Sequence, residues 1–275
     1  MRGNRFARRV RADVTSPFRV MTYNVRHEID GGRDAWDRRR DAIASTIRTC
    51  APDVVGLQET AVSQLSDLRA RLSAYEWDGC GEPQFGANNP VGVADTVESV
   101  ATELTWLSET PRTPGSNGWD GAFPRVLTEA TLDLGTHGGS PRVLTVFNTH
   151  FDHRGENARR ESARLIRRRI DELPSRRPVV LVGDFNVADG SPVERILTDG
   201  GYDRSLDDAW RIADDVRGPD TTFTDFTSIR PGRRLDRVFV TDDIEVLTAR
   251  TLTNRLDGAF LSDHLPVCVD VDLPA

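Results

Sequence analysis

Short runs in which apolar and polar residues alternate recur along this chain, and each predicts a β-strand with one buried face. The alternating runs are residues 18–23, 100–107 and 126–132. Residues 54–57 and 179–182 are apolar almost throughout, which predicts strands buried on both faces. Later strands are predicted at residues 143–148, 235–240 and 267–271.

Apolar residues at helical spacing predict helices between these strands. Two helices are expected at about residues 37–50, where Ile43 and Ile47 lie one turn apart, and at residues 62–72. A third, at about residues 156–173, has an apolar inner face and many arginines outside, and Arg167, Arg168 and Arg169 are expected on its solvated face. Ser191-Pro192-Val193-Glu194 has the cap, proline and glutamate that begin a fourth helix.

The order of these elements favours an α/β (α+β) fold over a regularly alternating parallel barrel. Several neighbouring strands are joined without a helix, so two packed sheets with helices outside are expected. Residues 79–97 and 111–124 are rich in glycine, asparagine or proline and are predicted to be loops, the first with room for one short strand. A chain of 275 residues suits one domain, assigned here to residues 17–275. Residues 1–16 are predicted to be a flexible basic tail, with a nucleic-acid or partner arm as the alternative.

The charge balance limits the range of partners. There are 43 acidic and 36 basic side chains, every one of the latter an arginine, and the net charge is −7. An acidic protein is a poor match for a long nucleic-acid footprint, which usually needs a basic face. A small phosphorylated substrate held through a metal remains compatible with this charge.

No apolar run approaches the length of a membrane span, and no apolar segment follows the basic N-terminus as it would in a secretory signal. Cys50, Cys80 and Cys268 are widely spaced and are interpreted as ordinary buried thiols of a reducing compartment. We therefore expect a cytoplasmic protein without a membrane association or an obligate protein partner.

Polar side chains follow one predicted strand after another. Asn24, Glu59 and His150 come at strand ends, Asp184 and Asn186 follow residues 179–182, and an Asp263-His264 pair lies near the C-terminus. Residues in such positions are held by a rigid sheet and yet lie at its rim. Carboxylate and amide oxygens are ligands of Mg²⁺ and Mn²⁺. The pattern predicts a site for one of these ions.

Six segments in this order resemble the endonuclease/exonuclease/phosphatase superfamily, which includes deoxyribonucleases, abasic-site nucleases, sphingomyelinases and inositol-polyphosphate phosphatases. The segments are residues 21–24, 53–59, 148–153, 183–186, 234–240 and 262–264. Residues 106–111, 114–116, 118–120 and 124–125 are similar to a subgroup of small prokaryotic members. The resemblance implies a four-layer α/β/β/α sandwich of the deoxyribonuclease type.

The resemblance also implies a role for each residue of the site. Glu59 matches the principal metal ligand, with Asn24 beside it and Asp263 as a further carboxylate. Asp184, helped by Asn186, matches the group that orients or deprotonates the attacking water. His264 acts at the phosphate with its tautomer fixed by Asp236, and His150 donates to a phosphate oxygen or the leaving group.

Other residues are weaker candidates for substrate contact. Arg125 follows a proline and is expected to reach a phosphate, or else to serve the structure. Asp152, His153 and Arg154 follow the strand that ends at His150, and are expected either to touch substrate or to start the next helix. His27 and Glu28 are expected near the mouth of the site. The aromatic and arginine that often follow Asn-Pro in the subgroup are replaced after Pro90, which suggests that a substrate contact has changed.

Together these residues predict a hydrolase of phosphomonoesters or phosphodiesters that depends on Mg²⁺ or Mn²⁺ and uses in-line attack by water. Its partner is then a phosphorylated small molecule or a nucleic acid. A DNA or RNA nuclease of the same superfamily is the alternative within the enzyme class. A binding module that kept the fold and lost the chemistry is the alternative outside it, and this predicts gaps in the residue set.

Overall fold

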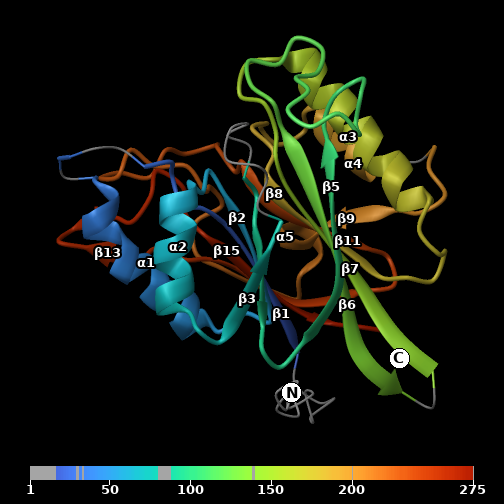
Figure 1. Cartoon of the computed structure of the whole chain (residues 1–275), viewed down its shortest axis with the longest axis horizontal. Coiled ribbons are helices and arrows are strands. Elements are labelled where there is room, and N and C mark those ends of the chain that lie inside the picture. Colours follow the sequence, from blue (N-terminus) through green and yellow to red (C-terminus); the bar gives the residue numbers. More distant parts are fainter. Residues whose placement is uncertain are drawn as a thin grey trace, which may run out of the picture.

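Two β-sheets lie face to face, and the long helices cover their outer faces (Figure 1). The computed structural model describes residues 17–28, 31–32, 34–79, 88–137, 140–199 and 201–274. The predicted tail at 1–16 lies outside the described residues, as do residues 80–87 of the segment predicted to be loop at 79–97. The four layers are those of the deoxyribonuclease-like sandwich that the sequence predicts.

The larger sheet, as far as the structure describes it, has seven strands. Their order is β10 (Asp215–Arg217), β12 (Glu245–Thr251), β15 (Val267–Asp272), β1 (Phe18–Asn24), β2 (Val54–Gln58), β4 (Val91–Ala94) and β3 (Tyr75–Asp78). Its outer face is covered by α1 (Trp36–Cys50) and α2 (Val62–Arg71), whose side chains share a core with β1 and β2.

The second sheet contains six strands within the described segments. Their order is β5 (Glu98–Trp106), β6 (Val126–His137), β7 (Ser140–His150), β8 (Val179–Asp184), β11 (Asp236–Thr241) and β9 (Leu206–Asp208). On its outer face α3 (Glu156–Asp171) and α4 (Pro192–Thr198) pack against β7 and β8. The short helix α5 (Ala209–Ile212) follows β9, and β13 (Arg255–Leu256) pairs with β14 (Ala259–Phe260).

Each sheet contains one parallel pair of strands joined by a helix, and this arrangement positions the site. β1 runs parallel to β2, with α1 between them in sequence, and β7 runs parallel to β8, with α3 between them. The carboxyl ends of all four strands therefore lie at one end of the sandwich. β15 and β11 are antiparallel to their neighbours, so both strands begin at that same end.

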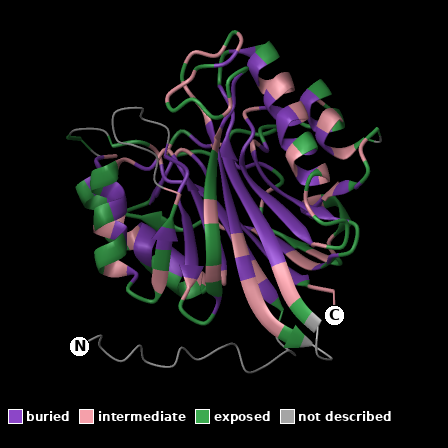
Figure 2. Cartoon of the chain, turned by 45° about the vertical axis from the view of Figure 1, so that its right-hand side comes forward, coloured by how far each residue is buried: buried purple, intermediate pink, exposed green. Residues whose placement is uncertain are grey.

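The space between the sheets is filled mainly by valine. Val20, Val146, Val182 and Val269 are all fully buried there, and buried strands occupy the middle of the molecule in Figure 2. Toward the site this core becomes polar, because Gln58 Nε2 donates to Asn148 Oδ1 across the sheets at 2.7 Å. Such hydrogen bonds satisfy buried polar groups and fix the relative position of the sheets.

The helices and the longer strands lie where the sequence predicts them. The predicted helix at 156–173 is α3, but the expectation for its arginines was wrong at one position: Arg167 is only 1% exposed. Its guanidinium lies over the ring of Tyr202 at 4.7 Å and donates to the carbonyl of Arg204. Arginine has a long aliphatic stem, so its charge does not by itself predict exposure.

Six short or mixed strands of the described residues, β3, β9, β10, β12, β13 and β14, were missed by the sequence pattern. β12 carries an apolar residue at only some of its inward positions and has a register irregularity between Val246 and Thr248. Strands of three or four residues are too short for a periodic signal.

Within the described residues, every helix is too short or too polar to cross a bilayer.

Candidate active site

The polar residues at the strand ends converge on one cavity of about 670 Å³ at the edge shared by the two sheets. In the register of the strands, His150 lies beside Asp184 and Asp184 lies beside Asp236. The cavity is lined on one side by the larger sheet and on the other by the second sheet, with Glu59, Asp263, His264, His150, Asp184 and Asn186 among its walls. The sandwich thus brings together side chains that lie up to 240 positions apart in sequence, from Asn24 to His264.

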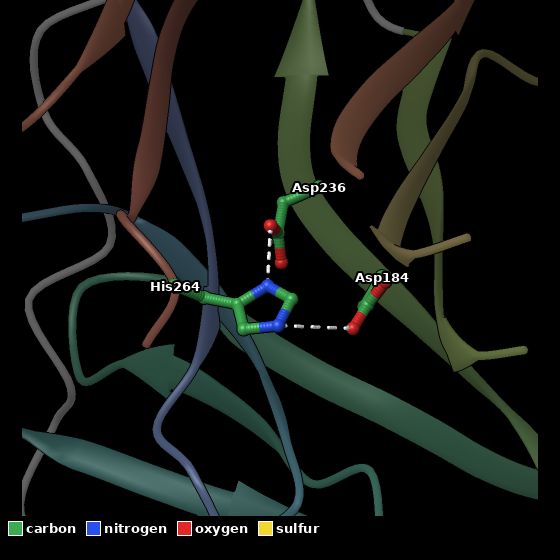
Figure 3. Close-up of side chains that lie close together, drawn as sticks. All are labelled: Asp184, Asp236 and His264. Atoms are coloured by element: carbon green, nitrogen blue, oxygen red, sulfur yellow. Dashed lines mark hydrogen bonds and ion pairs between the residues drawn. The ribbon is translucent and has the colours of Figure 1, made fainter. Parts of the chain in front are cut away.

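Asp236, His264 and Asp184 form a chain of contacts (Figure 3), in which His264 and Asp184 line the cavity. His264 Nδ1 lies 2.7 Å from Asp236 Oδ2, and His264 Nε2 lies 3.7 Å from Asp184 Oδ2. All three side chains are at most 6% exposed. The ring of Phe223 packs edge-on against the imidazole at 5.3 Å and holds its orientation.

The surroundings set the protonation of this chain. Burial alone would lower the pKa of His264, but the carboxylates of Asp236 and Asp184 raise it to about 10. Burial is the main cause that raises the pKa of Asp184 to about 6, with His264 opposing it. Near neutral pH His264 is therefore an imidazolium beside an Asp184 carboxylate that is ready to accept a proton.

His150 is in the opposite state. Burial, together with the charge of Arg125, lowers its pKa well below the ordinary value, so the ring is neutral. Asn186 Nδ2 donates to the carbonyl of Phe151 at 3.0 Å, which fixes the direction of the amide. The same nitrogen lies 3.0 Å from His150 Nε2, so Nε2 accepts and Nδ1 carries the proton.

Asn24 connects the two halves of the site. Its Nδ2 donates to Glu59 Oε1 at 3.2 Å and to Asp184 Oδ2 at 3.1 Å, and its Oδ1 accepts the amide of Arg26. In this orientation the amide nitrogen, not the oxygen, faces the carboxylates. Asn24 therefore orients Glu59 and Asp184, and its role as a metal ligand stays a prediction that requires the amide to rotate.

Glu59 has the properties of a ligand for a cation. It follows β2 with φ of 59°, a conformation that turns its side chain into the cavity from the end of the strand. Burial would raise its pKa, but hydrogen bonds from the His27 amide and Asn24 lower it, with help from His264 and Arg26. The carboxylate is thus ionised and has a fixed direction.

A positively charged side chain, that of Arg26, lies between Glu59 and Asp263. Arg26 Nη1 is 3.7 Å from Glu59 Oε2 and 3.4 Å from Asp263 Oδ2. Two carboxylates that converge on one positive group make a suitable pair for a hard divalent ion, and the donor set fits Mg²⁺ or Mn²⁺. The guanidinium is 39% exposed and can move aside.

A second group of potential ligands is the chain in Figure 3, since ligand atoms of Asp184, Asp236 and His264 lie within 4.8 Å of one another. Distance alone therefore permits an ion there, and Asp236 Oδ1 has no hydrogen-bond partner among the described residues. An ion bound there would need a lone pair of His264, and so would have to displace a proton from a ring whose pKa the two carboxylates raise to about 10. Without an ion, this group is suited to moving protons.

The candidate substrate contacts fall into two classes. Arg125 and His153 both line the cavity, and Arg125 Nη2 lies 3.4 Å from His153 Nδ1. Arg154 is exposed and is not among the cavity-lining residues; its backbone amide donates to Asp152 Oδ1. Its side chain as a substrate contact stays a prediction.

Asp152 is a buried support for this wall. Its two oxygens accept the amides of Ala122 and Phe123 on one side and of Arg154 and Gly155 on the other. It thereby connects the loop before β6 to the start of α3.

Asp120 makes a second connection between the same loop and helix. It accepts the amides of Asn157 and Ala158 in the first turn of α3, as a helix cap does. A Cβ at Gly155 would come within 2.7 Å of Asp120 Oδ1, so this close approach requires glycine.

Several residues of the site carry no clear signal in the sequence. Arg26, Asn89, Phe123 and Phe223 line the cavity, and none belongs to a strand that ends at it. Phe123 is 57% exposed and stacks on His153 at 5.8 Å, and an aromatic residue two positions before Arg125 is its only sequence clue. His27, expected near the mouth, does line the cavity.

The sequence model of the endonuclease/exonuclease/phosphatase family matches residues 21–264, which include every residue of this site. The chain belongs to that family. Members of the family are in general phosphoesterase hydrolases that typically use a divalent metal.

Solved structures of other members agree with this assignment. A family member from Bacteroides vulgatus is 34% identical, with a TM-score of 0.85, and the match covers 94% of this chain and all of that one. A mannosyl-6-phosphatase from Bacteroides thetaiotaomicron is 29% identical, with a TM-score of 0.82 and coverage of 92% and 99%. The D. rerio protein TDP2, solved with a single-stranded DNA product, shares the fold at 20% identity and a TM-score of 0.71, over 93% and 99% of the chains.

Proposed function

We propose that this protein is a Mg²⁺- or Mn²⁺-dependent phosphoester hydrolase whose substrate is a phosphorylated small molecule. The observation that carries the proposal is the pairing of two centres in one cavity. The carboxylates of Glu59 and Asp263 converge on a cation position, and the Asp236–His264–Asp184 chain lies beside them.

Hydrolysis needs a nucleophile on one side of the phosphorus and charge stabilisation around it. When bound, the ion would be held by Glu59 and Asp263 and would supply positive charge against the phosphate oxygens. Asp184, with a pKa of about 6, orients the attacking water and accepts its proton. Asn24 and the amide of Asn186 hold that carboxylate in place.

Three side chains of the cavity, His264, His150 and Arg125, would donate to the phosphate of a bound substrate. Asp236 keeps His264 protonated, so its imidazolium offers charge to a nonbridging oxygen. His150 is neutral, and its Nδ1–H is assigned the donation of a hydrogen bond to a phosphate oxygen or the leaving group. Arg125, only 16% exposed, adds a fixed charge on the far wall. The rim of Phe123 and His153 would contact the remainder of the substrate.

The size and charge of the cavity favour a small substrate. Its volume of about 670 Å³ lies in the range of small-molecule sites. The protein has a net charge of −7, which disfavours a long polyanion. The mannosyl-6-phosphatase neighbour makes a sugar phosphate monoester a suitable first candidate. A non-catalytic binding module is disfavoured because each predicted catalytic and metal position holds a side chain of the expected type.

The test is a hydrolysis screen on metal-free protein supplied with Mg²⁺ or Mn²⁺. The substrates are mannose 6-phosphate and other sugar phosphates, a nitrophenyl phosphate monoester and diester, plasmid DNA and RNA. We expect the highest kcat/KM on a small monoester, complete loss with EDTA and recovery with added ion. Metal-independent turnover would refute the proposal, and preferential cleavage of DNA or RNA would replace it by a nuclease.

A further inference from the structure

A pair of cysteines lies outside the active site and has no part in the proposed reaction. Cys50 is the last residue of α1 and Cys268 lies in β15, 218 positions further along the chain. Their Sγ atoms are 2.6 Å apart. The widely spaced cysteines gave no sign of this contact in the sequence, where both were interpreted as ordinary buried thiols.

The surroundings hold the two sulfurs together. α1 ends at Cys50 because Ala51 adopts a left-handed conformation, and Arg19 donates to the carbonyl of Cys50 at 2.7 Å. Cys268 is fully buried between β1 and β12, and Arg250 Nη2 lies 3.6 Å from its sulfur. The contact thus joins the end of a helix to the middle of a sheet.

We propose that Cys50 and Cys268 form a disulfide bond that cross-links the outer helix layer to the larger sheet. A disulfide needs the sulfurs to lie about 2.05 Å apart, and the contact of 2.6 Å already brings them close to that separation. The cross-link closes a loop that contains every residue of the site named above except Asn24, Arg26 and His27. It also anchors β15 four positions after His264.

The chemistry requires an oxidant, and a low-molecular-weight disulfide such as oxidised glutathione suffices. Cys50 is partly exposed, and the hydrogen bond from Cys268, aided by the charges of Arg19 and Arg250, lowers its pKa. Its thiolate attacks one sulfur of the oxidant, forms a mixed disulfide and releases the first small thiol. Cys268 then loses its proton, attacks Cys50 Sγ and releases the second. Two electrons pass from the protein to the oxidant.

The experiment is oxidation of the folded full-length chain with oxidised glutathione, followed by alkylation and a thiol count. The chain has three cysteines, so the count should fall from three to one, and digestion without reductant should yield a peptide joining Cys50 to Cys268. The melting temperature should rise by about 10 °C, because the cross-link restricts the unfolded chain, and dithiothreitol should reverse the rise.

Matched variants separate this cross-link from other thiol chemistry. Cys80→Ser should behave as the natural chain does, whereas Cys50→Ser should keep both of its thiols and show no rise in melting temperature. Cys50→Ser is the main control because its side chain is only partly buried, while Cys268→Ser risks damage to the core. Three free thiols after oxidation, a cross-link through Cys80, or an unchanged melting temperature would overturn the proposal. None of these results bears on the hydrolytic site.

Discussion

The two sides of the cavity are built from the same kinds of residue but have opposite physical properties. On the side of the larger sheet, Glu59 and Asp263 are 21% and 15% exposed and face the partly exposed guanidinium of Arg26. On the side of the second sheet, Asp184 and Asp236 are at most 1% exposed and face His264. Carboxylates open to the cavity can exchange one cation for another, whereas sealed carboxylates next to an imidazole control protons. In the proposed mechanism, burial more than residue type therefore separates the carboxylates that would bind the ion from those that transfer protons.

The substitution with the largest expected effect removes the Asp184 carboxylate, the proposed proton acceptor on the buried side of the site. Asp184→Asn keeps the size and the hydrogen-bond acceptor of the side chain, and should lower kcat at least about 10³-fold because no base remains for the attacking water. The measurement is the steady-state rate on the best substrate of the screen. Asp95→Asn, at an exposed position, is the matched control. Near-normal turnover in Asp184→Asn, with the fold intact by circular dichroism, would contradict the role of Asp184 as the base for the attacking water.

The next effect concerns the charge of His264. Because its pKa is raised to about 10, the imidazolium persists below that pH and is lost as the pH rises through it. Asp236→Asn removes the closest charge that stabilises it, so the alkaline limit of the kcat–pH profile should move down toward about 6.5. The rate near neutral pH should fall about 10²-fold. An unchanged alkaline limit would show that another group controls it.

The proposed role of Glu59 as a metal ligand, on the more exposed side of the cavity, is tested by measuring metal binding directly. Glu59→Gln should weaken Mn²⁺ binding to the metal-free protein at least about 100-fold, since the ion loses a charged ligand. Titration calorimetry measures this effect independently of turnover, and the exposed Glu245→Gln is the control. Equal affinity in natural and variant protein would place the ion elsewhere, with the group in Figure 3 as the first alternative.

Substitutions of Arg125 and Arg154 should differ in their effect on KM. Arg125 lines the cavity, so Arg125→Gln should raise KM about tenfold through loss of a charged hydrogen bond to substrate. Arg154→Gln should change KM less than about twofold, because only the backbone of Arg154 contributes to the wall. Similar KM values for both variants would contradict the distinction.

The smallest expected effect is on the affinity for Mn²⁺ when the positive charge of Arg26 is removed from the more exposed side of the cavity. Arg26→Gln removes the positive charge between Glu59 and Asp263, and should tighten Mn²⁺ binding about three- to tenfold. The gain is modest because the guanidinium is partly exposed and screened by water. Calorimetry on the same metal-free protein measures it. Weaker binding in this variant would mean that Arg26 supports the ion rather than competing with it.

Much of the architecture followed from local patterns. The predicted strand at residues 18–23 and the helix at 37–50 correspond to β1 and α1 within one residue at each end, since valine-rich strands and amphipathic helices leave periodic signals. The ordered motifs also predicted the family. Strands of three or four residues, such as β9 and β3, left no signal, because pairing with neighbours rather than their own sequence defines them.

For the active site, the sequence by itself predicted which side chains carry the chemistry, because strand-end carboxylates, amides and histidines are recognisable as residue types and as ordered motifs. Tertiary structure alone decided the surroundings of each of them. Burial lowers the pKa of both His150 and His264, but the carboxylates of Asp236 and Asp184 reverse this effect at His264, so the two rings differ in charge. The Asn24 amide nitrogen faces Glu59 and Asp184, and the role of Asn24 as a metal ligand stays a prediction. The contact of Cys50 with Cys268 and the cation position at Arg26 likewise join residues from separate elements. Distances, solvent exclusion and charge–charge energies depend on where the chain returns to itself in space, and no local pattern records that.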